Sequence, residues 1–217
     1  VFFSNLGLVI IDEQQRFGVD QRKKLISDSE ITPDQLVMTA TPIPRTTALS
    51  IYGDLEISSI NELPPGRKPI ISHLYSGLKK DNEKVFEKCY KHLDDDSQIF
   101  VVCPYIEESE SSDIQAAEKV FLEYSKKFTD YKVVLLHGKM SYEEKENIMR
   151  SMQDGSIDIL VSTVVIEVGI DIPNASLMII ESAERFGLNQ LHQLRGRVGR
   201  GEKQSECIFP VSYTHLR

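Results

Sequence analysis

The sequence predicts a doubly wound α/β fold, in which helices cover both faces of a parallel sheet. Short apolar runs alternate with amphipathic stretches along the whole chain, as strand and helix alternate in such folds. A proline-rich break at residues 64–69 divides this pattern into a short first part and a longer second part. The predicted strands are residues 6–11, 36–39, 70–74, 99–103, 132–136, 157–162 and 177–180, with 206–209 as a further candidate.

Amphipathic helices are expected between the strands. Residues 79–93 place their apolar side chains on one helical face, and residues 114–128 and 141–153 show the same periodicity. Ser141 followed by Glu144 forms a capping box, which marks the start of the third of these helices.

The break at residues 64–69 is expected to be a linker between two lobes, because three prolines and a glycine continue neither a helix nor a strand ladder. Residues 1–63 contain two predicted strands, too few for a complete parallel sheet. We interpret them as the C-terminal part of a first lobe whose other strands lie upstream of Val1. Residues 70–209 suffice for an independent second domain. Pro210 is expected to end the last strand, which leaves residues 210–217 as an atypical tail.

Composition indicates a globular protein of a reducing cytoplasm. The apolar runs are too short to cross a bilayer, and the chain opens with no secretory leader. Three scattered cysteines without a C-x-x-C spacing suggest neither a disulfide framework nor a zinc site. The formal net charge of −8 argues against a partner held by a general positive field. Positive charge is nevertheless concentrated in one late segment, at Arg185, Arg195, Arg197, Arg200 and Lys203.

Asp12 and Glu13 directly follow the first predicted strand, at its carboxyl end, where open α/β sheets collect their ligands. This position suits Mg-ATP: the aspartate would hold Mg²⁺, usually through water, and the glutamate would orient and deprotonate the attacking water. Taken alone, an acidic pair at a strand end is more often a helix cap, and that alternative stays open.

Hydroxyl side chains close two further strands. Thr39 and Thr41 either cap the next helix or hydrogen-bond the preceding acidic loop, and the two roles are compatible. Ser162 and Thr163 precede Gly-Ile-Asp-Ile-Pro at residues 169–173. Hydroxyls and free amides at a helix N-terminus bind phosphate without net charge, so an acidic protein could hold a DNA backbone there. An ordinary strand-to-helix connection is the alternative.

Arg195, Arg197 and Arg200 alternate with Gly196 and Gly199. The glycines permit close backbone approach, while forked guanidinium groups reach phosphate oxygens in pairs. An arginine on a transferring phosphoryl group accelerates the reaction by about a thousandfold or more. A patch for the DNA backbone is the alternative, and solvated charge is less compatible with the interleaved glycines.

Gly138 and Lys139 look like the end of a phosphate-binding loop but are not one. Val133 stands where that loop needs its first glycine, and Met140 stands where it needs serine or threonine. No G-x-x-x-x-G-K-[ST] loop occurs anywhere in the chain. His137 has no Cys or His partner at metal-binding spacing and is interpreted as a turn or backbone-contact residue.

Together these motifs resemble those of superfamily 2 helicases, and among them the RecG family of bacterial ATP-dependent translocases on branched DNA. The resemblance runs from about residue 3 to residue 208. It rests on DEQQRFG at 12–18, TATPIPRT at 39–46, YGDLEISSINELPPGR at 52–67, LHGKM at 136–140, STVVIEVGIDIP at 162–173 and ERFGLNQLHQLRGRVGRG at 184–201. The related Mfd translocases share several of these motifs, but YGDL and ELPPGR are similar to RecG rather than to Mfd.

The resemblance implies a RecA-like P-loop NTPase fold, with a truncated first lobe and one complete second lobe. It also implies roles for single residues. Those expected at ATP and Mg²⁺ are Asp12 (on the metal, through water), Glu13 (general base), Gly169, Asp171 (near the ribose), Gln193, Arg197 and Arg200. Those expected at DNA are His137, Gly138, Ser162 and Thr163. Those expected to couple the two sites are Gln15, Thr39 and Thr41.

Three positions depart from the family pattern. Gln15 stands where the family usually has histidine, although an amide still donates and accepts hydrogen bonds. Ser182 replaces a more usual asparagine, and residues 210–217 do not continue the pattern.

The predicted function is an ATP-dependent DNA helicase that acts in recombination and repair. ATP would bind between two lobes, and repeated closure would move the protein along DNA and remodel forks or Holliday junctions. The chain alone is expected to be inactive, because it lacks the phosphate loop, and the intact protein is expected in the bacterial cytoplasm near the nucleoid. A non-catalytic helicase-like module that binds DNA or a partner is the alternative. A metal nuclease is disfavoured, because no further carboxylates flank Asp12 and Glu13.

Overall fold

The computed structural model describes residues 6–13, 33–39, 56–60, 62, 66–76, 79–104, 110–163 and 172–211. Two compact units make up the chain, Val1–Ile60 and Asn61–Arg217. The boundary between them falls just before the predicted linker at residues 64–69. The assignment of these units to a first and a second motor lobe stays a prediction.

The first unit contains two parallel strands, β1 (Leu8–Ile11) and β2 (Asp34–Val37). Strand β2 begins two residues earlier than predicted, because pairing already starts where the Asp34 amide donates to the Gly7 carbonyl at 2.9 Å. The side chains of Val9 and Ile11 are buried, whereas Leu8, Ile10 and Leu36 are 54%, 57% and 48% exposed on the other face. Among the described residues of this unit, the sheet has one buried side and one apolar side that is about half exposed.

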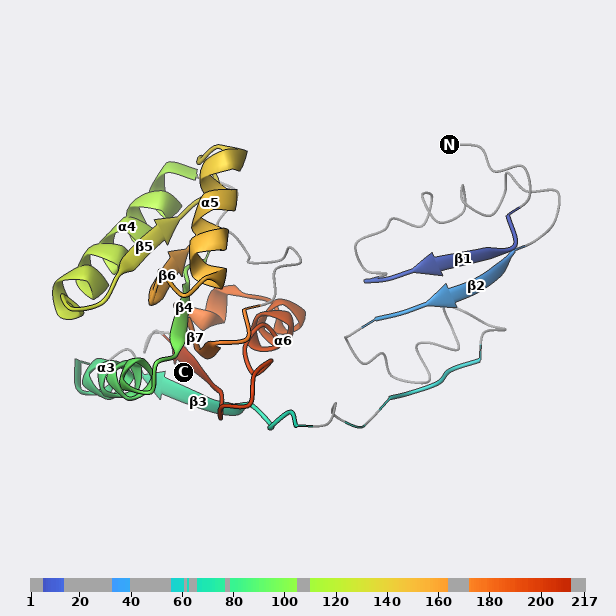
Figure 1. The fold of residues 1–217 in the computed structure, drawn as a ribbon, viewed down its shortest axis with the longest axis horizontal. Coiled ribbons are helices and arrows are strands. Elements are labelled where there is room, and N and C mark those ends of the chain that lie inside the picture. The colour runs from blue at the N-terminus through green and yellow to red at the C-terminus, as the bar shows by residue number, and fades with distance from the viewer. Residues whose placement is uncertain are drawn as a thin grey trace. The chain divides into compact units, whose positions relative to one another are not determined.

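The second unit contains a six-stranded sheet in which every neighbouring pair is parallel, in the order β3-β8-β7-β4-β6-β5 (Figure 1). The strands are β3 (Ile71–Ser76), β4 (Gln98–Val102), β5 (Val133–Leu136), β6 (Ile159–Ser162), β7 (Ala175–Ile180) and β8 (Glu206–Val211). All eight predicted strands of the chain are therefore present, with shifts of one or two residues at most of their ends.

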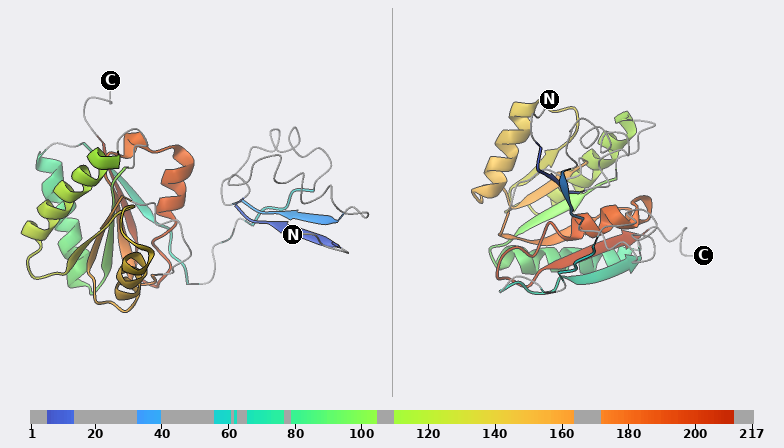
Figure 2. Two further views of the ribbon diagram at one scale, coloured as in Figure 1. Left: turned by 90° about the horizontal axis from the view of Figure 1, so that it is seen from above. Right: turned by 90° about the vertical axis from the view of Figure 1, so that its right-hand side faces the viewer.

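Helices cover both faces of this sheet, which confirms the doubly wound α/β prediction (Figure 2). The helices are α3 (Lys79–Asp94), α4 (Glu110–Lys127), α5 (Tyr142–Gln153) and α6 (Leu188–Arg195), with a 3-10 turn, η2 (Ala183–Arg185). Alternate residues of β4 face opposite ways: Ile99 packs with the α3 and α4 side chains, and Phe100 packs with those of α5 and α6. Continuous apolar strands result because both faces are buried.

Two polar devices secure the ends of α5. Ser141 caps the helix as predicted, since its hydroxyl accepts from the Glu144 amide at 3.2 Å and its own amide donates to the Glu144 carboxylate at 2.8 Å. At the other end, the buried Gln98 amide group donates to the carbonyls of Met152 and Ile157, both at 2.6 Å. A polar residue thus begins the central strand without an unsatisfied group.

One expectation about the fold is wrong. Pro210 does not end the last strand, because β8 continues to Val211. Beyond Ile208 this strand is paired with β3 alone, and proline is tolerated where a strand has a partner on one side only. Residues 212–217 of the predicted tail lie outside the described residues.

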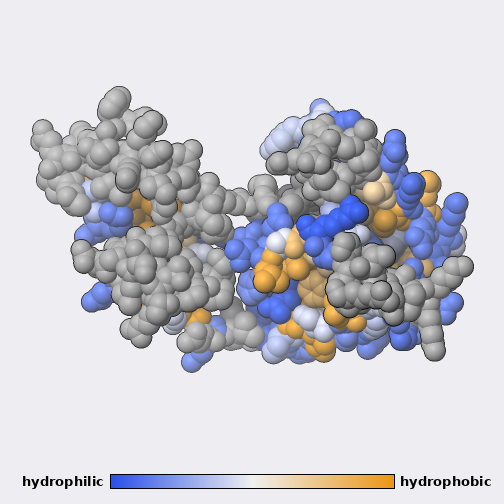
Figure 3. All heavy atoms as spheres, turned by 180° about the vertical axis from the view of Figure 1, so that it is seen from behind, coloured by the Kyte–Doolittle hydropathy of each residue, from blue (hydrophilic) through white to orange (hydrophobic). Residues whose placement is uncertain are grey.

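The surface of the second unit carries no membrane segment in the described ranges: no helix there is long and apolar enough to span a bilayer. Hydrophobic side chains are scattered among hydrophilic ones on the face shown in Figure 3. Cys89, Cys103 and Cys207 are free, buried thiols, as expected from their spacing. Burial raises the pKa of Cys103 and Cys207 to about 12, so neither thiol is activated.

Candidate functional site

The predicted acidic pair lies directly after β1, at the C-terminal end of the first sheet. The Asp12 carboxylate accepts a hydrogen bond from the Glu13 amide at 2.8 Å. Glu13 has a φ of 48°, a left-handed conformation that is uncommon for glutamate and costs energy. Such strained residues cluster at functional sites, where the surrounding structure holds them. The turn presents an exposed Asp12 and a half-buried Glu13.

Thr39 lies at the same end of the first sheet. Ile11 and Val37 are register partners, and the Met38 amide donates to the Ile11 carbonyl at 2.8 Å. Met38, which follows β2, therefore lies beside the end of β1, and Thr39 is the next residue in the chain. Gln15 and Thr41, which are expected to act together with Thr39 in coupling, lie outside the described residues. The coupling stays a prediction.

The four predicted DNA contacts come together at the C-terminal end of the second sheet. Strands β5 and β6 end side by side, and the Thr163 amide donates to the Leu136 carbonyl at 3.1 Å. His137 and Gly138 therefore lie next to Ser162 and Thr163. The side chains of Ser162 and Thr163 are buried, whereas Gly138 is exposed.

His137 adds an unusual polar atom to this group. Its Nδ1 is buried and has no hydrogen-bond partner among the residues that the structure describes. The neighbouring loop is held in place, because the Lys145 ammonium donates to the Gly138 carbonyl at 2.6 Å.

Glu181 lies at the same end of the sheet, after β7. Its amide donates to the Val102 carbonyl at 2.8 Å, so its position is fixed by the sheet. Burial, with smaller contributions from the charges of Glu123 and Glu184, raises the pKa of Glu181 to about 7. The Glu181 carboxyl group therefore binds its proton more tightly than an exposed glutamate does.

The predicted arginines lie in the segment 195–201, which we call the arginine segment. It starts at the end of α6, where the buried Leu194 and Val198 anchor it in the core. Gln193 lies on α6 and is half-buried. Arg197 is half-buried and Arg200 is exposed, so both guanidinium groups are near the surface.

Two glycines bring the arginine segment close to the rest of the unit. Gly199 has a φ of 76°, and a Cβ at this position would lie 3.0 Å from Ile70 Cγ1. A Cβ on Gly201 would lie 2.4 Å from the Pro173 carbonyl oxygen, so only glycine fits. Ile70 precedes β3 and Pro173 precedes β7. The segment therefore lies at the N-terminal end of the sheet, opposite the predicted DNA contacts.

This placement is relevant to the predicted ribose contact. Gly169 and Asp171 lie outside the described residues, but Ile172 and Pro173 directly follow Asp171 in the sequence. The backbone that leaves Asp171 is thus the backbone on which Gly201 packs. Gly201 thus packs on Pro173, two residues after Asp171 in the sequence, and the residues expected at DNA lie at the other end of the sheet.

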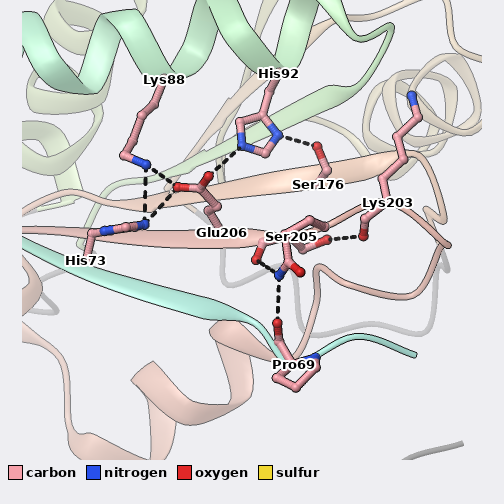
Figure 4. Close-up of polar contacts among 9 residues, drawn as sticks. Pro69, His73, Lys88, His92, Ser176, Lys203, Ser205 and Glu206 are labelled. Carbon is pink, nitrogen blue, oxygen red and sulfur yellow. Dashed lines mark hydrogen bonds and ion pairs between the residues drawn. The ribbon is translucent and has the colours of Figure 1, made fainter. Parts of the chain in front are cut away.

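Three side chains hold the arginine segment and the residues after it in place through contacts that the sequence did not predict. The Lys203 ammonium donates to the Asp96 carbonyl at 2.9 Å and to the Ser97 hydroxyl at 3.1 Å, so Lys203 is structural. The Gln204 side chain donates to the Pro69 carbonyl at 2.7 Å (Figure 4). The Arg67 Nε donates to the Gly199 carbonyl at 2.8 Å. No spacing in the sequence predicts these contacts.

The backbone conformation of Ser182 explains why the family pattern usually has asparagine at this position. It has a φ of 51°, in the left-handed region, just before η2. Asparagine tolerates this conformation better than serine does, which gives a physical reason for the asparagine that the family pattern led us to expect.

The fold and these sites define a helicase domain. The sequence matches the helicase conserved C-terminal domain over residues 81–202, more than half of the chain, and the chain therefore belongs to this family. Within it, the chain is similar to the ATP-dependent DNA helicase RecG of Aquifex aeolicus, with 54% identity over 97% of this chain and 26% of the relative. The expected resemblance to RecG is confirmed.

Solved structures agree. The structure of RecG bound to a three-way DNA junction has a TM-score of 0.70 and 45% identity, over 98% of this chain and 27% of that one. The Mycobacterium smegmatis helicase Lhr, bound to single-stranded DNA and AMP-PNP, has a TM-score of 0.64 at 16% identity, over 94% of this chain and 28% of that one, which shows a shared fold. The chain spans about a quarter of the length of the RecG relatives.

Proposed function

We propose that this chain is the part of an ATP-dependent DNA helicase of the RecG type that contains the hydrolytic carboxylates and the phosphate-contacting arginines. The observation that carries the proposal is the packing of Gly201 on Pro173, which supports a single nucleotide-facing surface for the arginine segment and the segment that contains Asp171. In the full motor, this surface would face Asp12 and Glu13 across the nucleotide.

The described residues fit Mg-ATP. Mg²⁺ prefers carboxylate oxygens, keeps several waters and is usually held by one or two carboxylates with substrate phosphates. Asp12 is an exposed carboxylate at a sheet end that suits this, and no cluster of three or more metal-binding side chains occurs in the described ranges. When bound, Mg²⁺ would neutralise phosphate charge.

The roles of the chain's own groups follow from their chemistry. The Glu13 carboxylate would accept a proton from the attacking water, and Arg197 and Arg200 would stabilise the charge that develops on the phosphate oxygens. Asp171 and Gly169 would contact the ribose side of ATP. His137 and Gly138, with Ser162 and Thr163 behind them, would contact the DNA backbone.

The substrate proposed is branched DNA, such as forks and Holliday junctions, in recombination and repair within the bacterial cytoplasm. The open apolar face of β1 and β2 supports the proposal that further lobe elements, including the phosphate loop, complete the first unit. The 217 residues alone should therefore not hydrolyse ATP. DNA-stimulated phosphate release by the purified chain would contradict this expected inactivity. It would also contradict the proposal that the first lobe is incomplete.

The direct test of the function uses Arg200→Ala in a full-length RecG protein that carries this sequence. DNA-stimulated ATP hydrolysis should fall by about a thousandfold, because the arginine acts on the transition state, while ATP affinity weakens only modestly. Arg150→Ala is the matched control, since Arg150 lies exposed on α5 and pairs only with the adjacent-turn Glu146. Full turnover in Arg200→Ala would remove the role proposed for Arg200, whereas a full-length protein without any DNA-stimulated hydrolysis would favour a non-catalytic binding module.

A further inference from the structure

The connector that enters the second unit runs along the arginine segment and its continuation. Besides the Arg67 contact with Gly199, the Gln204 side chain donates to the Pro69 carbonyl, and the Ile71 amide donates to the Ser205 carbonyl at 3.0 Å. Ile70 packs on Gly199. The hydrogen bonds of Arg67 with Gly199 and of Gln204 with Pro69 join residues that are 132 and 135 positions apart in the chain.

The contact of Arg67 is the one nearest to the predicted chemistry. Gly199 lies between Arg197 and Arg200, and its φ of 76° is the conformation that turns the chain between them. The Gly199 carbonyl orientation follows from that φ and from the neighbouring ψ. A charged donor at 2.8 Å on this carbonyl therefore restrains the peptide plane that directly precedes Arg200.

We propose that Arg67 is a positioning residue, which holds the Gly199 carbonyl and thereby sets the direction in which Arg200 leaves the backbone. The proposal rests on the function proposed above, because only a nucleotide makes that direction matter for turnover. It extends that function by linking the connector between the units to the phosphate-contacting arginines.

The chemistry of the side chain supports a positioning role. A guanidinium group is planar and presents its Nε–H in a fixed direction, so one hydrogen bond from it fixes an angle as well as a distance. Lysine would keep the charge but not the fixed donor. Arg67 is half-buried, so the bond is partly protected from water, whereas the next residue, Lys68, is exposed.

The first measurement reads the backbone and needs no activity. In the 217-residue chain, Arg67→Ala should speed amide hydrogen exchange in residues 196–205 by about tenfold, because the segment loses a tertiary anchor. Exchange in the central strand β4 should be unchanged, which shows that the unit is still folded. Lys68→Ala, which removes the same charge one residue later, should leave residues 196–205 unchanged. Equal exchange in Arg67→Ala and Lys68→Ala would overturn the proposal.

The second measurement reads catalysis in the full-length protein. Arg67→Ala should lower the DNA-stimulated kcat by about ten- to a hundredfold, as expected for misplacement of a catalytic group by about an ångström. The KM for ATP should change less than about twofold, because ground-state binding is retained. Arg67→Lys should recover part of kcat, and Lys68→Ala should keep all of it. A normal kcat in Arg67→Ala, or a loss seen only in KM, would overturn the positioning role.

The two readouts separate this proposal from the function on which it rests. Suppose that Arg200→Ala retains full turnover while Arg67→Ala still speeds exchange in residues 196–205. The structural role of the Arg67–Gly199 hydrogen bond is then confirmed, but its catalytic role is overturned together with the proposed function. If Arg200→Ala is inactive and Arg67→Ala is normal in both measurements, the proposed function stands and the role of Arg67 is overturned.

Discussion

The backbone of Gly201 packs directly on the carbonyl group of Pro173. A Cβ on Gly201 would lie 2.4 Å from that oxygen, a separation that real side chains do not reach. Because the obstacle is backbone and not a flexible side chain, it cannot move aside cheaply. This contact joins the end of the arginine segment to Pro173, two residues before the start of β7.

Gly201→Ala should therefore destabilise the second unit by about 1–3 kcal/mol, the usual cost of forcing an extra carbon into a packed site. Urea unfolding followed by far-UV circular dichroism is a suitable measurement, because the chain has no Trp and all the described helices belong to the second unit. Gly138→Ala is the control, since a Cβ there has no atom within 4 Å. Equal stability of the two variants would show that the Gly201 contact is not tight.

A second prediction concerns the ion cluster between helix α3 and strands β3 and β8. Glu206 is nearly buried and pairs with Lys88, with the His73 Nε2 at 2.8 Å, and with the His92 Nε2 at 3.7 Å (Figure 4). Burial favours the neutral acid, but the hydrogen bond and charge of Lys88, with the charges of His92 and His73, outweigh it and lower the pKa of Glu206. Burial lowers the pKa of His92, against the attraction of Glu206.

Both shifts make the unit less stable in acid. A lowered carboxylate pKa contributes stability above the ordinary value of 4.5, which is lost as pH falls through the folded pKa. A lowered histidine pKa costs stability once pH falls below 6.5, because the unfolded chain then binds the proton more tightly. Glu206→Gln should cost about 2 kcal/mol near pH 7, since it leaves Lys88 unpaired, and much less near pH 3.5.

Urea unfolding at the two pH values tests this. Glu146→Gln is the comparison, because Glu146 forms an exposed pair with Arg150 on α5 that should contribute less than about 1 kcal/mol at either pH. A Glu206→Gln penalty that is the same at both pH values would mean that the carboxylate charge is not the source of the stability.

The hydrophobic pattern of the sequence predicted the strands, but it did not predict helix α6. The apolar run at residues 99–103 predicts a buried strand, and β4 is Gln98–Val102, displaced by one residue because Gln98 is polar yet buried. Helix α6 escapes the pattern. Its eight residues are fewer than the window of about 11 in which periodicity can be recognised, and of its leucines Leu188 is 83% exposed while Leu194 is buried.

The sequence likewise predicts some contacts of the candidate site and not others. Strand ends predict that His137 and Thr163 meet, because parallel strands finish at one end of a sheet. The bond from Arg67 to Gly199 spans 132 positions and depends on how the connector turns into β3, which no local rule specifies. Similarly, Lys203 resembles one more phosphate-binding cation in the sequence, and only its bonds to Asp96 and Ser97 reveal a structural role.

A third prediction uses the raised pKa of Glu181. Its folded pKa of about 7 lies above the ordinary 4.5, so the folded unit binds this proton more tightly than the unfolded chain does. Stability should therefore fall as pH rises from about 4.5 through 7, and Glu181→Gln should remove that loss. We expect the variant to be more stable by roughly 1–3 kcal/mol at pH 8 and indistinguishable at pH 4.

Urea unfolding at pH 8 and pH 4 measures the difference. Glu118→Gln, on the exposed surface of α4, removes one carboxylate without a burial penalty and should shift neither value by more than about 0.5 kcal/mol. A destabilised Glu181→Gln at pH 8 would contradict the prediction, because it would mean that the ionised carboxylate is favourably bound where it lies.

The two ends of β5 offer a matched test of where DNA binds. Lys132 is exposed just before the strand and Lys139 is exposed just after it, beside Gly138. If the C-terminal end of the sheet contacts the DNA backbone, Lys139→Ala in the full-length protein should weaken binding and reduce the slope of log affinity against log salt by about 1, because one counterion fewer is released. Lys132→Ala removes the same charge at the opposite end and should leave both quantities unchanged.

Fluorescence anisotropy with a labelled three-way junction at several salt concentrations gives affinity and slope together. Equal losses in the two variants would indicate a general field effect, and a larger loss in Lys132→Ala would place the DNA at the other end of the sheet, beside the arginine segment.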